Sequence, residues 1–227
     1  MNDTKRLCLA DFDDTLILTD SLKSIMRRER WLMSPALFAA GVRLFICKRT
    51  SRRELDARNR FKKHMMLKYR DLPSAKKEQY YQELRGKINT SVITNIREKH
   101  FDRIAIVSAS EEELIRQVLG DTLGEIEIIA NIIPGTKSPS VQNGNISFQA
   151  TEAKTQHNSG SAVDNEQFRT CYGPEKVRRL AEAIPDYTDY QITVYTDSYS
   201  DQPLIDIADE AYLVKGTATE LIKGQHT

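Results

Sequence analysis

The sequence predicts an α/β fold built on a mainly parallel sheet, with an α-helical segment inserted after the first strand. An apolar run of strand length at residues 7–10 ends abruptly in acid at Asp11. Strand-like and helix-like stretches alternate from about residue 103 onward, whereas residues 19–87 carry only helical patterns. Parallel strands need crossover connections, so this alternation indicates right-handed β-α-β units. The first strand can join the same sheet only if the helical segment is an insertion.

Length and composition agree with one domain plus an insertion. The 227 residues are 40% hydrophobic, which is enough to bury a sizeable core. The three cysteines, Cys8, Cys47 and Cys171, are far apart and form no Cys-x-x-Cys pair, so they indicate neither a disulfide framework nor a zinc site. The first residues lead directly into a strand and lack the pattern of a secretory signal, so we expect a cytoplasmic protein.

The charge is divided unevenly along the chain. Residues 19–87 hold 19 Lys+Arg and 7 Asp+Glu, a balance of 19 − 7 = +12, while the remainder holds 14 and 25, a balance of −11. A basic helical segment suits contact with a phosphorylated substrate, an anionic lipid surface or nucleic acid. The alternative is a solvated charged face that docks on an acidic core.

The helical segment opens with a short helix expected at residues 21–30. Residues 31–47 are almost wholly apolar, interrupted by Ser34, Pro35, Gly41 and Arg43. This stretch is too short and too interrupted to span a bilayer comfortably. We therefore expect a buried helix, with a membrane-surface helix flanked by basic residues as the alternative.

Two further helices are predicted in this segment. Ser51 and Glu54 have the spacing of a capping box, which would start a long helix. Its apolar stripe would run through Leu55, Phe61, Met65 and Met66. Another helix is expected from Pro73 and Ser74 to about Arg85, with Gly86 near its end.

Strand character returns at residues 103–108. A helix should follow, with Ser110 as its cap and Glu113 as the capping-box partner, ending near Leu119 and Gly120 before a strand at 125–130. Residues 134–168 are polar and read as a long loop or a hairpin, with one strand candidate at 145–149. A helix with Pro174 at its first position and strands at 191–196 and 210–214 complete the pattern.

Chemically reactive side chains follow three of these strands and also occupy the start of one helix. They are Asp11 and Asp13 after the first strand, Ser108 after the second, Lys176 at a helix start, and Asp197 with Asp201 after a later strand. The carboxyl ends of parallel strands meet at one edge of a sheet, so we expect these residues to gather there. A carboxylate can form a transient acyl phosphate, and a second can exchange protons with the leaving oxygen and with water. Carboxylates beside a phosphate need a lysine and a divalent cation, for which oxygen ligands favour Mg²⁺.

These motifs resemble those of the haloacid dehalogenase (HAD) superfamily of phosphohydrolases. Residues 11–15, Asp-Phe-Asp-Asp-Thr, are similar to the first motif, Ser108 to the second, Lys176 to the third, and Asp197-Ser-x-x-Asp201 to the fourth. The stretches 171–177 and 195–204 look most like the branch containing phosphoserine phosphatase and the phosphatidylglycerophosphate phosphatases. The resemblance implies a Rossmann-like three-layer sandwich formed by residues 1–18 and 88–227, with residues 19–87 as a helical cap domain.

The resemblance also implies roles for individual residues. Asp11 would be the nucleophile and a Mg²⁺ ligand, and Asp13 the general acid/base, lending the metal its main-chain carbonyl. Thr15 would contact the phosphate or support the loop, and Ser108 and Ala109 would bind the phosphate. Lys176 would neutralise negative charge, and Asp197 and Asp201 would bind the metal. Asp20 would recognise the substrate. Asp14 and Thr196 stand where many relatives carry glycine, which puts the loop geometry and the rate in doubt.

The expected reaction is Mg²⁺-dependent hydrolysis of a phosphomonoester, from a small phosphorylated metabolite or a lipid-linked phosphate. A phosphomutase or phosphotransferase of the same fold is an alternative. Another is a non-catalytic module that binds a polyanion or a membrane through the basic segment. We expect no nucleic-acid partner, and peripheral membrane contact is a minor alternative.

Overall fold

The computed structural model describes residues 4–47, 54–132 and 168–224. Its centre is a six-stranded sheet with the strand order β3-β2-β1-β4-β5-β6. All neighbouring strands pair in parallel except β5 and β6, which are antiparallel. The strands are β1 Arg6–Ala10, β2 Arg103–Glu111, β3 Glu127–Asn131, β4 Gln191–Thr196, β5 Glu210–Lys215 and β6 Ala218–Lys223. The predicted α/β class with a mainly parallel sheet is confirmed.

The apolar run that ends in Asp11 forms the central strand. In β1, Leu9 lies beside Ala105 of β2 on one side and Val194 of β4 on the other. From β1 the chain continues outward through β2 and β3, and then crosses to β4 on the opposite side. This order creates a switch point between β1 and β4, and ligand crevices in open α/β sheets form at such points.

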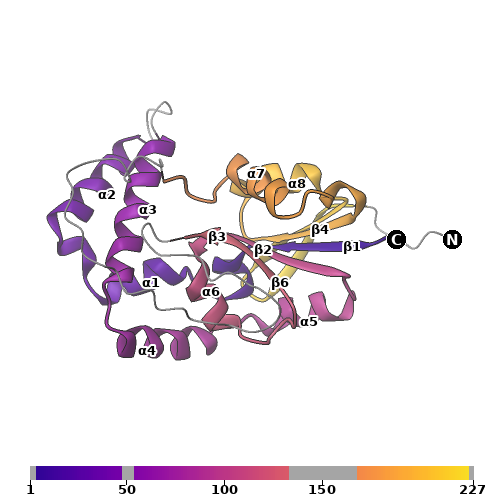
Figure 1. Cartoon of the computed structure of the whole chain (residues 1–227), viewed down its shortest axis with the longest axis horizontal. Helices are drawn as coiled ribbons and strands as arrows, with labels where there is room; N and C mark the ends of the chain where they lie inside the picture. Colours follow the sequence, from indigo (N-terminus) through magenta and orange to yellow (C-terminus); the bar gives the residue numbers. More distant parts are fainter. Residues whose placement is uncertain (1–3, 48–53, 133–167, 225–227) are drawn as a thin grey trace, which may run out of the picture.

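Helices cover both faces of the sheet, which gives three layers (Figure 1). On one face lie α7 (Pro174–Ala183) and α8 (Gln202–Ile207), and on the other α5 (Thr90–Glu98) and α6 (Glu112–Leu119). Because successive strand residues point to opposite faces, Leu7 and Leu9 belong to the hydrophobic cluster that contains Leu180 of α7. Cys8 and Ala10 belong to the cluster that contains helices α5 and α6.

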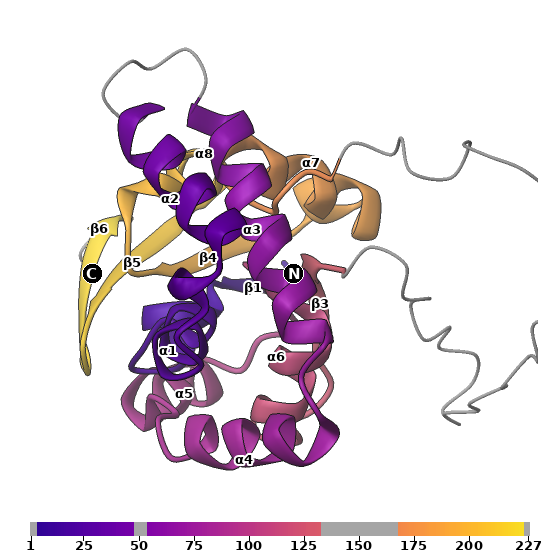
Figure 2. The same ribbon diagram turned by 90° about the vertical axis from the view of Figure 1, so that its left-hand side faces the viewer.

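We call residues 19–87 the helical segment, and its described residues form four α-helices. These are α1 Ser21–Arg28, α2 Pro35–Cys47, α3 Glu54–Arg70 and α4 Ser74–Arg85, with a 3₁₀ turn at Trp31–Met33 before α2. Helices α2 and α3 pack side by side, and α4 packs against α6 of the core (Figure 2). The short helix after Asp20 and the helix ending near Gly86 are confirmed. The division into a cap domain and a core domain at 18/19 and 87/88 stays a prediction.

The prediction of a buried helix across residues 31–47 is wrong for α2. Among its described side chains only Leu37 and Cys47 are buried, whereas Phe38, Val42 and Ile46 are exposed. The reason is that α2 packs against α3 and the 3₁₀ turn on one side only. Sequence hydrophobicity thus indicated a helix correctly but could not show which of its faces other elements cover.

Other segments also differ from expectation. Leu55, placed in the apolar stripe of α3, is exposed, while Met65 and Met66 are buried. The antiparallel strand β6, which follows β5 through a turn at Gly216 (φ 62°), was not anticipated. Ser51 of the predicted capping box and the strand candidate at 145–149 lie outside the described residues. Within the described ranges, no helix is both long and apolar enough to cross a membrane.

Candidate active site

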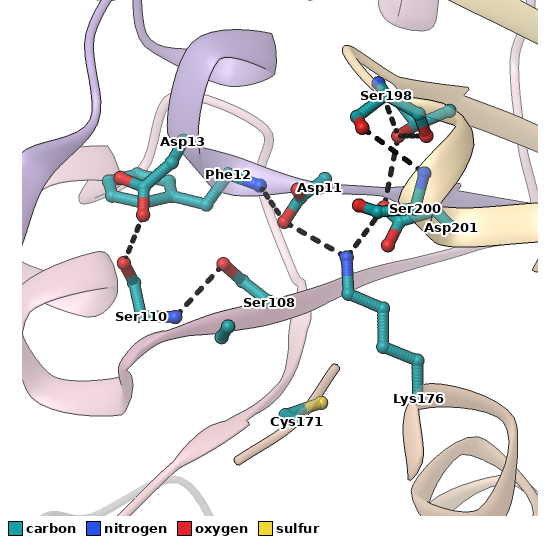
Figure 3. Close-up of polar contacts among 12 residues, drawn as sticks. Asp11, Phe12, Asp13, Ser108, Ser110, Cys171, Lys176, Ser198, Ser200 and Asp201 are labelled. Carbon is teal, nitrogen blue, oxygen red and sulfur yellow. Dashed lines mark hydrogen bonds and ion pairs between the residues drawn. The ribbon is translucent and has the colours of Figure 1, made fainter. Parts of the chain in front are cut away.

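Asp11 lies at the switch point, immediately after the central strand. Its main-chain N–H donates to the carbonyl of Tyr195 in β4 at 2.9 Å, which extends the β1–β4 ladder by one residue. Its side-chain Oδ1 accepts a hydrogen bond from Phe12 N at 2.8 Å and lies 3.3 Å from Lys176 Nζ (Figure 3). Both of these contacts are made by the same oxygen. The carboxylate is therefore oriented through Oδ1, and Oδ2 takes part in neither contact.

The turn after Asp11, Phe12–Leu16, is closed by a hydrogen bond from Ile17 N to the carbonyl of Phe12 at 3.1 Å. Asp14 takes the left-handed conformation, with φ 55° and ψ 5°. Aspartate tolerates this region better than most residues other than glycine. The backbone at Asp14 therefore has a conformation that glycine also adopts readily.

Thr15 is fully buried at the base of the same turn. Its hydroxyl has no hydrogen-bond partner among the described residues, while its carbonyl accepts from Asn89 Nδ2 at 3.0 Å. The same amide nitrogen donates to the carbonyl of Gly216 at 2.8 Å. Asn89, which the sequence analysis did not single out, thus ties the reactive turn to the β5–β6 turn.

Asp13 lies on the other side of the turn from Asp11 (Figure 3). Its Oδ1 accepts from the main-chain N–H of Ser21 at 2.8 Å, and its Oδ2 accepts from the hydroxyl of Ser110. Burial, followed by the negative charge of Asp20, raises the pKa of Asp13 to about 6, against the opposing effect of these hydrogen bonds and Lys62. Asp13 can therefore exchange a proton near neutral pH, which a general acid/base must do.

Ser108 is buried near Asp13 and Ser110, and its Oγ accepts a hydrogen bond from the main-chain N–H of Ser110 at 3.2 Å. The half-buried Ala109 is tied to β3, because its carbonyl accepts from Asn131 Nδ2 at 2.6 Å. Both residues lie where the pairing of β2 with β3 shifts register, between Val107 and Glu111. The irregular strand end turns this stretch toward the switch point.

The predicted capping box at Ser110 and Glu113 is wrong. Strand β2 continues to Glu111, and α6 begins only at Glu112. The Glu111 carboxylate caps the helix by accepting from Leu114 N at 2.7 Å. Burial raises the pKa of Glu111 to about 7. The Ser110 hydroxyl instead donates a hydrogen bond to Asp13. The sequence pattern of a helix cap did not indicate this contact.

Lys176 is a buried cation between two carboxylates. It lies in the first turn of α7, after Gly173 (φ 58°) and Pro174. Its Nζ lies 2.6 Å from Asp201 Oδ2 and 3.3 Å from Asp11 Oδ1. Burial acts to lower the pKa of Lys176, but the charges of Asp11 and Asp201 outweigh it and raise that pKa, so the ammonium stays charged. A fixed positive charge at this place suits an anionic substrate.

Asp201 is held in place by a second donor. Its Oδ2 also accepts from the Thr196 hydroxyl at 2.9 Å, and that hydroxyl in turn accepts from Ser198 N at 3.2 Å. Thr196, the second position that departs from glycine, thus contributes a hydrogen bond that glycine cannot make. Its side chain orders the turn after β4 and leaves both carboxylates and the lysine in place.

Asp197 follows β4 and is half-buried. Burial, and then the negative charges of Asp11, Asp14 and Asp201, raise its pKa to about 6. Across the described ranges, no group of three or more His, Cys, Asp or Glu side chains is close enough to hold a metal ion. A magnesium ion commonly uses one or two carboxylates and keeps several waters. Asp11, Asp197 and the carbonyl of Asp13 fit that donor set, and the crowded negative charge fits a cation.

Asp20 is the N-cap of α1. Its Oδ1 accepts from Lys23 N at 2.8 Å, and its Oδ2 lies 2.7 Å from Lys23 Nζ. Burial opposes ionisation of Asp20, but the charges of Lys62 and Lys23 outweigh it and lower the pKa of this carboxyl. Lys62 of α3, one of the basic residues of the helical segment, acts electrostatically on both Asp13 and Asp20. The helical segment therefore brings a positive charge toward the acidic turn.

Comparisons with known proteins identify a family and several structures to which this chain is similar. The family model described as haloacid dehalogenase-like hydrolase matches residues 8–206. A protein of unknown function from Bordetella pertussis Tohama I aligns with 92% of this chain and 89% of its own, at 19% identity and TM-score 0.58. A HAD family hydrolase, t0658, from Salmonella enterica serovar Typhi aligns with 92% of this chain and 62% of its own, at 12% identity and TM-score 0.54.

A phosphoserine phosphohydrolase-like protein from Francisella tularensis subsp. tularensis SCHU S4 covers 91% of this chain and 85% of its own, at 19% identity and TM-score 0.43. The Bordetella and Salmonella structures, at 19% and 12% identity, support the fold alone. No curated protein matches the sequence significantly. Since the family model spans most of the chain, and the sheet order and the acids at the switch point agree with it, the chain belongs to the haloacid dehalogenase-like hydrolase family.

Proposed function

We propose that this protein is a Mg²⁺-dependent phosphomonoester hydrolase that acts through an aspartyl phosphate on Asp11. The observation that carries the proposal is the contrast between two neighbouring carboxyl groups. Asp11 contacts the buried ammonium of Lys176 at 3.3 Å, whereas Asp13 lies in a buried site where its pKa is raised to about 6. Two carboxyl groups with such different surroundings suit the separate roles of nucleophile and proton donor.

In the first step, Asp11 Oδ2 attacks the phosphorus of the ester, and the bond from phosphorus to the alcohol oxygen breaks. Asp13 delivers its proton to that oxygen, so the alcohol leaves neutral. In the second step, water attacks the phosphorus of the acyl phosphate and gives a proton back to Asp13. Inorganic phosphate leaves and the Asp11 carboxylate is restored. Lys176 offsets the negative charge of the phosphoryl group throughout.

The residues that would hold Mg²⁺ are Asp11, Asp197 and the main-chain carbonyl of Asp13, with Asp201 supporting the site through Lys176. When bound, the ion supplies charge neutralisation that lets a phosphate dianion approach these carboxylates. We assign contact with the phosphate oxygens to Ser108 and the adjoining main chain at Ala109. The substrate class we propose is a small phosphorylated metabolite or a lipid-linked phosphate.

The test combines three variants with two substrates. Asp11→Asn should reduce turnover of p-nitrophenyl phosphate by several orders of magnitude, because no other group forms the acyl phosphate. Asp13→Asn should lose about 10²–10⁴-fold with an alkyl phosphate and less in the first step with p-nitrophenyl phosphate, whose leaving group hardly needs a proton. Asp14→Asn, in the same turn, is the matched control and should stay close to the wild-type rate. EDTA should abolish activity, and added Mg²⁺ should restore it.

Full activity of Asp11→Asn would refute the nucleophile assignment. Equal losses by Asp13→Asn on both substrates, together with weaker Mg²⁺ binding, would refute its acid/base role. If the wild-type protein transfers phosphate between two sugars and releases no inorganic phosphate, the phosphomutase alternative replaces hydrolysis.

A further inference from the structure

Helix α2 carries an apolar face that no described element covers. Residues 38, 42 and 46 recur at helical spacing, so they share one side of α2. The exposed large apolar side chains that we call the α2 face are Met33 (77% exposed), Phe38 (60%), Val42 (43%) and Ile46 (56%). An apolar hollow on α2 is lined by Phe38, Ala39, Val42, Arg43, Ile46 and Cys47. Contiguous apolar surfaces of this kind mark docking sites for proteins or membranes.

The α2 face lies on the outside of the molecule. Figure 1 shows α3 between α2 and the sheet, with α2 outermost. Helix α3 is fastened to the core, because Asn59 Oδ1 accepts from Thr170 N at 3.0 Å and the Arg58 guanidinium lies 3.9 Å from the centre of the Tyr172 ring. A flat partner can therefore contact α2 without displacing α3 or disturbing the candidate active site.

The charge around the α2 face identifies the partner. Helix α2 contains no acidic residue, and its one charged side chain, Arg43, is exposed. Six of the seven acidic residues in the helical segment form ion pairs with basic residues of the same segment: Asp20, Glu29, Glu54, Asp71, Glu78 and Glu83. The described part of the segment holds 15 basic residues against these seven acidic ones, a balance of 15 − 7 = +8. An apolar face within a basic surface matches an anionic lipid bilayer.

We infer that the α2 face docks the protein on anionic lipid membranes, with α2 lying in the plane of the headgroups. Its 13 residues span only about 20 Å, less than the roughly 30 Å hydrocarbon core, so α2 lies on the bilayer and does not cross it. A second copy of the chain is a poorer partner, because it would bring two segments of charge +12 together. This inference does not rest on the proposed hydrolysis, since binding to lipid needs no catalysis.

The test is sedimentation of the full chain with vesicles of phosphatidylcholine, with and without phosphatidylserine. The wild-type protein should bind the mixed vesicles, and binding should weaken with added salt and be much lower on pure phosphatidylcholine. Phe38→Gln/Val42→Gln/Ile46→Gln should weaken binding at least about 100-fold, because each large apolar side chain withdrawn from water changes a partition constant roughly tenfold or more. Ile132→Gln, an exposed apolar residue at the end of β3, is the matched control and should bind normally. Asp11→Asn should also bind normally, which separates docking from hydrolysis.

Equal binding by the triple variant and the wild-type protein, or no binding of the wild-type protein to phosphatidylserine vesicles, would overturn the inference. A wild-type dimer that the triple variant converts to monomer, without vesicle binding by either, would assign the α2 face to contacts between copies. If the triple variant does not unfold cooperatively, Phe38→Gln decides, with an expected loss of about tenfold. Trp31, the single tryptophan, lies directly before α2 and gives a second readout, since lipids brominated in the upper acyl chain should quench its fluorescence in the wild-type protein.

Discussion

Replacing Lys176 by methionine should destabilise the fold by about 3–5 kcal/mol near pH 8, because it leaves two carboxylates without their buried partner. The side chain of Lys176 is only 2% exposed, and its Nζ lies 2.6 Å from Asp201 and 3.3 Å from Asp11. At an effective dielectric constant of about 20, the two attractions are worth about 6 and about 5 kcal/mol. Desolvation of each ion offsets several kcal/mol of this gross attraction, which brings the expected loss to the value above.

The loss should depend on pH in a defined direction. The folded-state pKa of Lys176 is raised, so its contribution in the wild-type protein is fully present below the ordinary lysine pKa and constant from pH 5 to pH 8. Burial raises the pKa of Asp201, and Lys176 opposes this shift. In Lys176→Met that opposition is lost, so the Asp201 carboxyl group binds a proton more readily in the folded than in the unfolded chain. The variant should therefore regain stability as pH falls and lose it as pH rises through the folded-state pKa of Asp201.

Urea unfolding near pH 5 and near pH 8 measures this difference. Lys68→Met, which removes an exposed lysine of α3, is the control and should change stability by less than about 0.5 kcal/mol at either pH. Lys176→Met/Asp201→Asn should recover part of the loss near pH 8, since one of the two uncompensated charges is gone. An equal loss at both pH values, or no recovery in the double variant, would refute the electrostatic explanation.

Three further predictions concern stability and use the same unfolding assay. Glu111→Gln should flatten the pH dependence of the free energy of unfolding. Burial raises the pKa of Glu111 to about 7, so the wild-type fold loses up to about 3 kcal/mol of stability as pH rises from the ordinary glutamate range to about 7. An unchanged pH dependence in the variant would contradict this. Asn89→Ala should lower the free energy of unfolding by about 2–4 kcal/mol, because the carbonyls of Thr15 and Gly216 lose their hydrogen-bond donor. A decrease below about 1 kcal/mol would show that water replaces the Asn89 amide. Asp14→Val should destabilise the fold by about 1–2 kcal/mol and Asp14→Gly by less than about 0.5 kcal/mol, because φ at this position is 55° and a β-branched side chain is strained there. Equal urea unfolding midpoints for the two variants would contradict this explanation.

The residues of the candidate active site could be found from the sequence because their positions follow from strand ends. Asp11 and Asp197 each come directly after an apolar run, and parallel strands place their carboxyl ends at one edge. Lys176 is similar, since the Gly-Pro pair before it marks a helix start. Local sequence therefore sufficed for the groups that the strands and helix starts deliver directly.

Local sequence patterns could not predict the hydrogen-bond partners and charged neighbours of those groups. Ser110 has the spacing of a helix cap, yet its hydroxyl donates to Asp13, and Glu111 caps the helix instead. Asn89 had no distinguishing sequence pattern, and Lys62 belonged to a general basic excess that did not show which acidic residues it lies near. Contacts such as these join residues far apart in the chain, and only the folded arrangement brings them together.

The same distinction holds for the molecule as a whole. The sequence by itself determined the α/β class, the helical character of residues 19–87 and the acids at the strand ends, because periodicity, caps and composition are local properties. Only the tertiary structure decided that β6 adds an antiparallel edge, that Asp13 is buried beside Ser110, and that one side of α2 remains uncovered. The physical reason is that burial and pKa depend on which neighbours the fold supplies, and an apolar helix has the same sequence pattern whether or not another element packs against it.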